Sequence, residues 1–315
     1  MGEIGKLKAT EIAAARRPYY GWAVVAVATV VAFCSGPGQS YVFSVFLDSI
    51  IEATGFSRTQ VSALYAVGTG LSALLVVFVS RLADRRGPRV MLIVVAAGLG
   101  LACFGMSVAS GPITIFLAFA SLRALGQGSL PVNGTLLVAN WFVRYRGRAM
   151  SIIGLGFAAS NALIPPISRL LIDEIGWRGA YAALGVMVWL LVIPAAIFVV
   201  RDRPEEMGLH PDGASEPPEG ELQAGAAQRG GASRRVLTSL QFWLLAIPMS
   251  APSLIVTALV FHQVSIFEEQ GLSASVAAGV FVPYAVASAG MSLFSGYLID
   301  RIGPRWLFVS NLVML

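Results

Sequence analysis

Arg123 stands near the middle of a long apolar stretch that runs from Ile113 to Ala139. If this stretch is a membrane-crossing helix, the rise per residue places Arg123 roughly 15 Å from its start, close to the bilayer midplane. An ionisable side chain at that depth is costly and indicates a functional site by default. None of the other apolar stretches offers an Asp or Glu at a comparable depth. We therefore expect Arg123 to face a central cavity, where it attracts an anionic ligand or steers a proton. The alternative is pairing with backbone carbonyls or with a residue beyond the end of this sequence.

Other polar side chains in the apolar stretches could also contact a ligand. Gly36-Pro37-Gly38 interrupts the first stretch, and a broken helix at mid-depth exposes backbone groups that only protein or a water-filled cavity can satisfy. A lone histidine can sense protons, whereas an intramembrane asparagine more commonly bonds to a neighbouring helix. Helix packing is the alternative role for all of these side chains. Besides Arg123, the candidate ligand contacts are Gln39, Tyr41, Asn133, Asn161, His262 and Gln263.

No motif indicates an enzyme. The sequence has no Walker loop, and its paired glycines follow no strand, so neither nucleotide-driven pumping nor dinucleotide binding is expected. Two distant histidines, and two cysteines that lie within apolar stretches (Cys34 and Cys103), give no metal-binding pattern. We expect no cofactor, no metal ion and no disulfide bond.

The composition indicates which elements must position these residues. Hydrophobic residues make up 56% of the chain and charged residues 12%, which is too apolar for a soluble domain. Stretches of about 20 apolar residues, long enough to cross a bilayer, recur along the sequence. Each should be a helix, because an open strand would leave backbone groups unpaired in lipid. A ninth stretch opens at Trp306, after eight complete ones: Trp22–Leu47, Gln60–Val79, Val90–Ala109, Ile113–Ala139, Ala149–Ile172, Gly179–Val200, Phe242–Phe267 and Ala274–Ile299.

Lysines and arginines gather on one side of these helices. With the N-terminus inside, all 22 lie in inner segments except Arg123 and three in outer loops, Arg58, Arg169 and Arg178. Short loops rich in Lys and Arg stay in the cytoplasm during insertion. We therefore predict a multi-pass protein of the cell membrane with a cytoplasmic N-terminus. The net charge of +5 then reports topology, and nucleic acid is not an expected partner.

A short charged phrase occurs twice in the chain. Leu82–Arg89 reads LADRRGPR, and Leu298–Arg305 reads LIDRIGPR. A chance product of the Lys and Arg bias is the alternative to a duplication. The shared register extends well outside the phrase, which favours a duplication. The same offset carries Gly55 onto Gly271, Ser57 onto Ser273, Ser72 onto Ser288 and Phe78 onto Phe294.

Residues 201–235 separate the two copies. They are rich in Pro, Gly, Ala and Glu and have almost no apolar periodicity, which predicts a flexible linker. A six-helix half, a linker and a second half that restarts in the same orientation are typical of parallel-repeat transporters. We predict a cytoplasmic leader at 1–18, a six-helix half at 19–200, a cytoplasmic linker at 201–235 and the start of a second half at 236–315.

The charged phrases resemble the loop between the second and third helices of the major facilitator superfamily, G-x-L-a-D-r-x-G-r-[KR]-x. Arg123–Gly128 (RALGQG) is similar to that family's fourth-helix motif. Gly176-Trp177-Arg178, between the fifth and sixth apolar stretches, also resembles sequences of that family. Tyr19–Trp22 (YYGW) and Arg203–Leu209 (RPEEMGL) resemble the branch that contains the monocarboxylate and oxalate/formate carriers. The resemblance covers the chain from about Tyr19 to its end. It implies an all-α bundle of six plus six helices, of which the last three to four would lie beyond Leu315.

In such a protein the charged turns would form a latch that holds the inner gate shut in one state. An aspartate there can accept hydrogen bonds from amides at a neighbouring helix N-terminus, and arginines can pair with carboxylates or lipid phosphate. The alternative is a loop that is merely well anchored. The predicted gating residues are Asp84, Arg85, Gly87, Arg89, Asp300, Arg301, Gly303 and Arg305.

Together these features predict a secondary transporter that works by alternating access. The resemblance and Arg123 favour a small organic anion such as a monocarboxylate, with a co-transported proton. The expected partners are therefore a small-molecule solute, a proton and the lipid bilayer. The alternatives are transport of a neutral solute, and a transport-inactive relative that acts as a membrane sensor or binds a partner protein.

Overall fold

The computed structural model describes residues 19–214 and 238–302. All regular structure in these ranges is helical, which confirms the predicted all-α class. The elements are α2 (Gly21–Cys34), η1 (Gly36–Gly38), α3 (Ser40–Thr54), α4 (Arg58–Arg86), α5 (Pro88–Val108), α6 (Pro112–Leu122), η2 (Arg123–Ser129), α7 (Leu130–Trp141), α8 (Arg146–Phe198), η3 (Pro204–Met207), η4 (Pro211–Gly213), α11 (Leu240–Glu269), α12 (Ala274–Gly279) and α13 (Phe281–Ile302).

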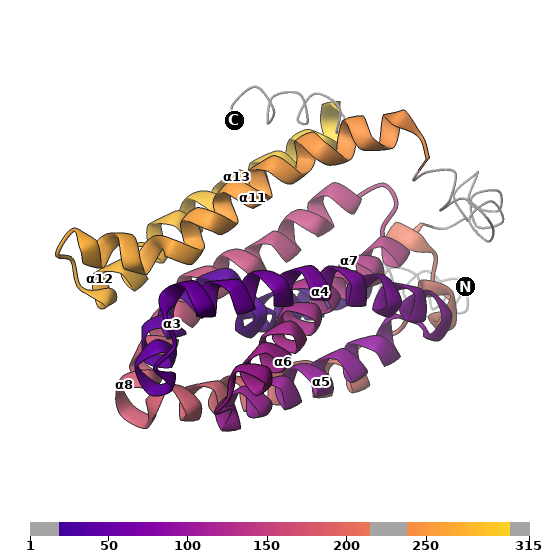
Figure 1. Cartoon of the computed structure of the whole chain (residues 1–315). Helices are drawn as coiled ribbons and strands as arrows, with labels where there is room; N and C mark the ends of the chain where they lie inside the picture. Colours follow the sequence, from indigo (N-terminus) through magenta and orange to yellow (C-terminus); the bar gives the residue numbers. More distant parts are fainter. Residues whose placement is uncertain (1–18, 215–237, 303–315) are drawn as a thin grey trace, which may run out of the picture.

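Seven helical stretches of the described chain are long and apolar enough to cross a membrane. The prediction was eight, and α8 accounts for the difference. At Gly176 its backbone leaves the helical region, with φ 74° and ψ 163°, so α8 consists of a first arm (146–175) and a second arm (177–198). These arms correspond to the predicted fifth and sixth spans. Figure 1 shows α8 turning back at the end of the molecule that also carries α12.

Two of the spans are not continuous α-helices. The first span consists of α2, η1 and α3, and the break that the sequence predicts at Gly36–Gly38 is present as η1. The fourth span consists of α6, the π-helical η2 and α7. Single π-helical turns occur frequently at functional sites. The second and third spans are α4 and α5, the seventh is α11, and the eighth is α12 with α13.

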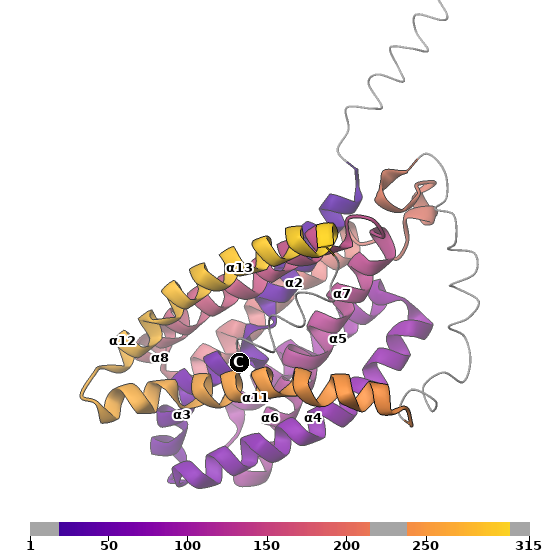
Figure 2. The same ribbon diagram turned by 90° about the horizontal axis from the view of Figure 1, so that it is seen from above.

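The first six spans form a bundle, and α11 and α13 lie along one side of it, close together at α12 and diverging away from it (Figures 1 and 2). The third span packs on the second arm of α8, where Trp189 Nε1 donates to the carbonyl oxygen of Ala97 at 3.1 Å. The eighth span packs on the first arm, where Ser292 Oγ donates to the carbonyl oxygen of Ser151 at 3.2 Å. The two arms of α8 therefore face different neighbours. Cys34 and Cys103 are free thiols in the buried core.

The molecule has two ends, named here for one residue at each. The Tyr19 end carries the start of the first span, and the Gly176 end carries the turn of α8 and also α12 (Figure 1). Large apolar side chains are exposed between the ends; Leu74 and Phe78 of α4 are 65% and 68% exposed. In a membrane these side chains would face lipid or further helices.

The turns before the second and eighth spans have the same construction. Gly55 and Gly271 both adopt positive φ, 70° and 79°. Two residues later, Ser57 Oγ accepts from the amide of Gln60 at 3.2 Å, and Ser273 Oγ accepts from the amide of Val276 at 3.3 Å. Each serine caps a helix N-terminus. The duplication inferred from the sequence therefore extends to backbone conformation and capping.

The predicted linker differs from the structure at its start. Residues 201–214 form η3 and η4 and pack on the Tyr19 end, where buried Pro204 and Pro211 anchor them. Periodicity could not reveal this, because single side chains, and not an apolar face, hold the segment. Residues 215–235 fall in the range outside the described residues. The division into two halves stays a prediction.

Candidate functional site

The break in the first span lies directly against the π-helical turn of the fourth. A Cβ atom on Gly38 would lie 2.8 Å from Cα of Gly126 and would overlap the carbonyl oxygen of Leu122. Only glycine fits at this crossing, because any side chain would push the two backbones apart. The crossing brings the exposed backbone groups of η1 within reach of side chains on η2.

Arg123 is the first residue of η2 and is only 4% exposed. Its Nη1 donates to the carbonyl oxygen of Gly38 at 3.2 Å and to Oγ of Ser40 at 3.3 Å. Its Nε donates to Oγ1 of Thr69 in α4 at 3.1 Å. The guanidinium therefore joins the first, second and fourth spans and satisfies a carbonyl that the break leaves open. This contact is the backbone pairing that the sequence offered as the alternative.

No carboxylate among the described residues pairs with Arg123. The ion pairs found in the described ranges, Arg58 with Asp48 and Arg169 with Asp173, involve other residues near the Gly176 end. Carbonyl and hydroxyl dipoles stabilise this buried cation, and no carboxylate in the described part of the chain balances its charge.

Tyr65 of α4 covers the guanidinium and is a site residue that the sequence reasoning missed. The guanidinium carbon of Arg123 lies 4.8 Å from the ring centre, and the tyrosine hydroxyl donates to Ser40 Oγ at 2.9 Å. The same ring lies 4.6 Å from that of Phe261 in α11 and stacks on Phe43 at 4.7 Å. Arg123 is thus one side chain away from the seventh span. A signal was available, since Tyr65, Thr69 and Ser72 recur at helical spacing and mark a polar stripe on α4.

The space beside Arg123 is small in this conformation. Gln39, Tyr65, Arg123 and Tyr181 line a void of about 10 Å³. That volume admits no more than one water molecule. Gln39 turns its amide back to its own segment, where Nε2 donates to Ser35 Oγ at 3.1 Å. A solute could therefore contact Arg123 only after Tyr65 or the broken segment moves.

Tyr41 and Asn161 form a second group, next to the eighth span. The Tyr41 hydroxyl donates to Ser160 Oγ at 2.9 Å, and the Tyr41 ring lies 6.3 Å from that of Phe281 in α13. Asn161 follows Ser160 in the first arm of α8. Within the described residues, the buried Oδ1 of Asn161 has no hydrogen-bond partner. The structure thus places Tyr41 where the first six spans meet the last two, and Asn161 one residue from the serine that Tyr41 contacts.

The remaining predicted contacts are more scattered. Asn133 donates from Nδ2 to the carbonyl oxygen of Ser129 at 2.8 Å, one turn earlier in the fourth span. His262 is exposed on α11, with its ring against Phe261. Gln263 Nε2 donates to the carbonyl oxygen of Ala277 at 3.2 Å and so ties α11 to α12. None of these contacts reaches Arg123.

The geometry of a broken first span, a buried cation on the fourth and a helical bundle can now be compared with known proteins. The sequence profile described as Major Facilitator Superfamily matches residues 28–315. The chain belongs to the major facilitator superfamily. This family match points to a transporter and not to an enzyme.

Two relatives of known name match about half of this chain each. It is 32% identical over 150 residues to the Escherichia coli (strain K12) protein named "Probable L-galactonate transporter", covering 46% of this chain and 32% of the relative. It is 26% identical over 170 residues to the riboflavin transporter RibJ of Trypanosoma brucei brucei, covering 52% and 30%.

The fold is similar to a crystal structure of a bacterial homologue of the human lysosomal transporter Spinster, inward-facing and unoccupied. The TM-score is 0.67 at 17% sequence identity, over 92% of this chain and 64% of that one. This chain therefore spans less than two thirds of the length of these superfamily members.

The first charged turn of this superfamily member stabilises the bundle itself. Arg89 was expected to pair with carboxylates or lipid phosphate. Instead its Nη2 donates to the carbonyl oxygen of Ile197 at 2.7 Å, at the C-terminus of α8. Its amide donates to Oδ1 of Asp202 at 2.7 Å. Gly87 adopts φ 83°, and a Cβ there would also overlap the Asp202 carboxylate, so both the backbone conformation and the available space require glycine. Arg85 is exposed.

The second charged turn is described only in part. The guanidinium carbon of Arg301 lies 4.9 Å from the ring centre of Tyr297. The side chains of Asp84 and Asp300, and the residues Gly303 and Arg305, lie outside the described part of the chain. The latch between the turns therefore stays a prediction.

Proposed function

We propose that this chain is part of a secondary active transporter that moves a small organic anion, such as a monocarboxylate, by alternating access and with a co-transported proton. The observation that carries the proposal is Arg123. It is 4% exposed, has no carboxylate partner among the described residues and lies where the first span breaks. A buried, unpaired guanidinium is stabilised when a carboxylate binds it through two parallel hydrogen bonds.

The relatives support this substrate class but leave an alternative. Galactonate, in the name of the Escherichia coli relative, is a carboxylate; riboflavin, in the name of the trypanosome relative, carries no carboxylate. A neutral solute is therefore the second candidate. It would make Arg123 a purely structural link between the first, second and fourth spans.

The aromatic rings that cover the site in this conformation indicate the route by which a solute would enter. At the Gly176 end, Phe261 of α11 packs against Phe43 and Tyr65, and Phe281 of α13 lies against Tyr41. We propose that this end faces outward, that the Tyr19 end faces the cytoplasm of a cell-membrane protein, and that parting of these rings admits the solute. Tyr41, Gln39 and Asn161 are the proposed further contacts, while Asn133, His262 and Gln263 are weaker candidates.

The test is uptake of labelled mono- and dicarboxylates by the complete protein in liposomes, with and without an imposed proton gradient. Arg123→Gln removes the charge, and Arg123→Lys keeps it but loses the planar fork. We expect uptake of at least one acid, its loss in Arg123→Gln, and a raised KM in Arg123→Lys. Stimulation by an inward proton gradient would support proton coupling.

Three outcomes would contradict parts of the proposal. Uptake of an acid that persists unchanged in Arg123→Gln would remove Arg123 from the site. Uptake of neutral solutes alone, at equal rates in both variants, would establish the structural role of Arg123. Absence of transport from a well-folded protein across both panels would favour the sensor or partner-binding alternative.

A further inference from the structure

The segment after the sixth span contacts several elements at the Tyr19 end. We call residues 201–214 the strap. Its first residues bond to the third and fourth spans: Asp202 Oδ1 accepts from the Arg89 amide at 2.7 Å, and its carbonyl oxygen accepts from Asn140 Nδ2 at 3.2 Å. The carbonyl oxygen of Arg201 accepts from Trp141 Nε1 at 3.0 Å. The strap therefore moves with the first six spans.

Asp212 makes the most concentrated set of contacts in the strap. Its Oδ2 accepts from the amides of Val143 and Arg144 at 3.0 and 2.7 Å, and its Oδ1 accepts from the amide of Tyr145 at 3.2 Å. These three amides precede α8, which begins at Arg146. Amides at a helix start lack partners within the helix, and a carboxylate is favoured there by the helix dipole.

The backbone around Asp212 is shaped for this contact. Asp212 adopts φ 58°, a left-handed conformation that aspartate, asparagine and glycine tolerate best. Pro211 is buried beside it, and Gly213 lets the Tyr19 ring approach to 3.0 Å of where a Cβ would lie. The Tyr19 hydroxyl donates to the carbonyl oxygen of His210 at 3.1 Å. The YYGW and RPEEMGL motifs, with the following Pro-Asp-Gly, thus build one structure.

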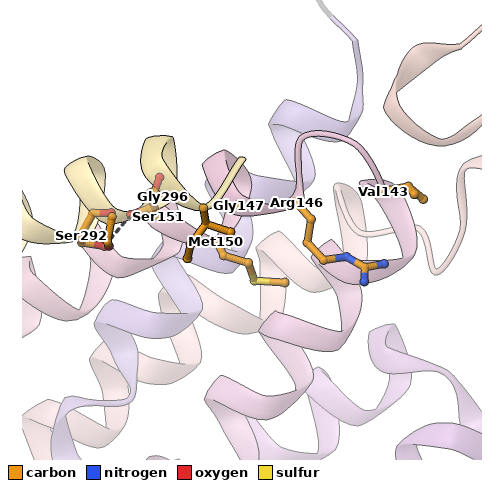
Figure 3. A pocket seen from close by; sticks show the side chains of 9 residues that line it. Val143, Arg146, Gly147, Met150, Ser151, Ser292 and Gly296 are labelled. Carbon is orange, nitrogen blue, oxygen red and sulfur yellow. Dashed lines mark hydrogen bonds between the residues drawn. The ribbon is translucent and has the colours of Figure 1, made fainter. Parts of the chain in front are cut away.

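The helix start that Asp212 holds is also where the first arm of α8 meets the eighth span. A groove of about 470 Å³ between them is lined by residues of both, including Arg146, Met150, Ser292 and Ile299. Within its lining, Ser292 Oγ donates to the Ser151 carbonyl oxygen at 3.2 Å. Figure 3 shows this bond, with Arg146 and Val143 at the loop that leads into α8. A Cβ on Gly296 would lie 3.0 Å from the carbonyl oxygen of Gly147, so the two helices approach each other closely at this point.

We infer that Asp212 is a positioning residue, which fixes the first turns of α8 so that they dock on the eighth span. The strap is then a built-in support for the contact between the first six and the last two spans. The inference concerns the helix contact and does not depend on the solute.

The test is disulfide formation between Ser151→Cys and Ser292→Cys in the complete protein, in a background that carries Cys34→Ala and Cys103→Ala. Asp212→Gly removes the carboxylate without adding strain in the left-handed conformation. We expect the rate of cross-linking to fall about fivefold, the equilibrium effect of losing one N-terminal cap. Amide hydrogen exchange at 143–145 should rise in the same variant.

Two further variants keep the test decisive. Asp212→Asn keeps an acceptor and the left-handed preference, so its cross-linking rate should fall between those of the parent and Asp212→Gly. Glu206→Gln removes an exposed carboxylate from the same strap and should leave the rate unchanged. Faster amide exchange at 143–145 with an unchanged cross-linking rate would show that Asp212 stabilises only the turn before α8. That result would overturn the inference. If Asp212→Gly does not fold, an unchanged rate in Asp212→Asn would overturn it equally.

Discussion

Arg123 donates a hydrogen bond to the carbonyl oxygen of Gly38, at a distance of 3.2 Å and a separation of 85 residues along the chain. The bond joins the π-helical turn of the fourth span to the break in the first. Two irregular backbone segments thus meet at the only deeply buried cation that the structure describes within a span. Irregular backbone inside a membrane protein is stable only where protein or an internal cavity satisfies it.

The glycine crossing beside this bond should be intolerant of added volume. Gly126→Ala would place a Cβ within 2.9 Å of the Gly38 backbone nitrogen. We expect a loss of about 1–3 kcal/mol, as for overpacking in a core. Thermal unfolding in detergent measures it. Gly105→Ala in α5 is the matched control, because no atom lies within 4 Å of a Cβ there. Equal melting temperatures for the two variants would contradict a close approach of the two backbones at this crossing.

The Gly176 end is closed by a polar contact as well as by aromatic rings. Arg58 pairs with Asp48 at 2.6 Å and also donates to Ser265 Oγ of α11. Ser265→Ala should widen the distance distribution between spin labels at Ala53→Cys and Gln270→Cys, because it removes a hydrogen bond between α4 and α11. Asp173→Asn, which breaks an ion pair within α8, should leave the distribution unchanged. Identical distributions in all three proteins would show that the rings alone hold this end shut.

The two repeated serine caps should contribute to stability independently. Ser57→Ala removes an oxygen that accepts from Gln60, and Ser273→Ala removes the equivalent acceptor for Val276. We expect each variant to lose about 1 kcal/mol in the free energy of unfolding, the usual value for an N-terminal cap. Ser57→Asp should retain most of the stabilisation that the cap provides, because aspartate is also a favoured N-cap residue. The effects should add, since the two turns belong to different helices; a double variant no worse than either single one would argue against separate caps.

Ionisation of the Tyr19 hydroxyl should destabilise the folded protein at alkaline pH. Burial, with a smaller contribution from the Asp212 charge, raises the pKa of Tyr19 from 10.0 to about 12. The folded protein therefore keeps this proton between pH 10 and 12 while the unfolded chain loses it. Stability from this group is complete below pH 10 and falls as the pH rises towards 12. Thermal unfolding from pH 8 to pH 11.5 should decline less steeply for Tyr19→Phe than for the parent. Parallel declines would contradict a raised pKa.

Much of the fold could be predicted from the sequence because its signals are local. Apolar length predicts the spans, and Gly36-Pro37-Gly38 predicts the break at η1. The Gly-x-Ser turns at Gly55 and Gly271 predict equivalent helix starts. The residues at 201–214 were assigned to a linker for the same reason: local composition there is polar, and the contacts that order it come from Asp202 and Asp212 reaching distant helix starts.

The sequence by itself determined that this protein is a bundle of apolar helices with a buried cation on the fourth span, because hydrophobic length, charge and turn chemistry are properties of neighbouring residues. Only the tertiary structure decided what that cation meets. Tyr65 was missed because a tyrosine in an apolar stretch reads as packing. Its contacts with Arg123, Ser40 and Phe261 exist only because four spans converge there. Helix crossing angles and close approaches at Gly38 and Gly126 set that convergence, and no local pattern along the chain encodes them.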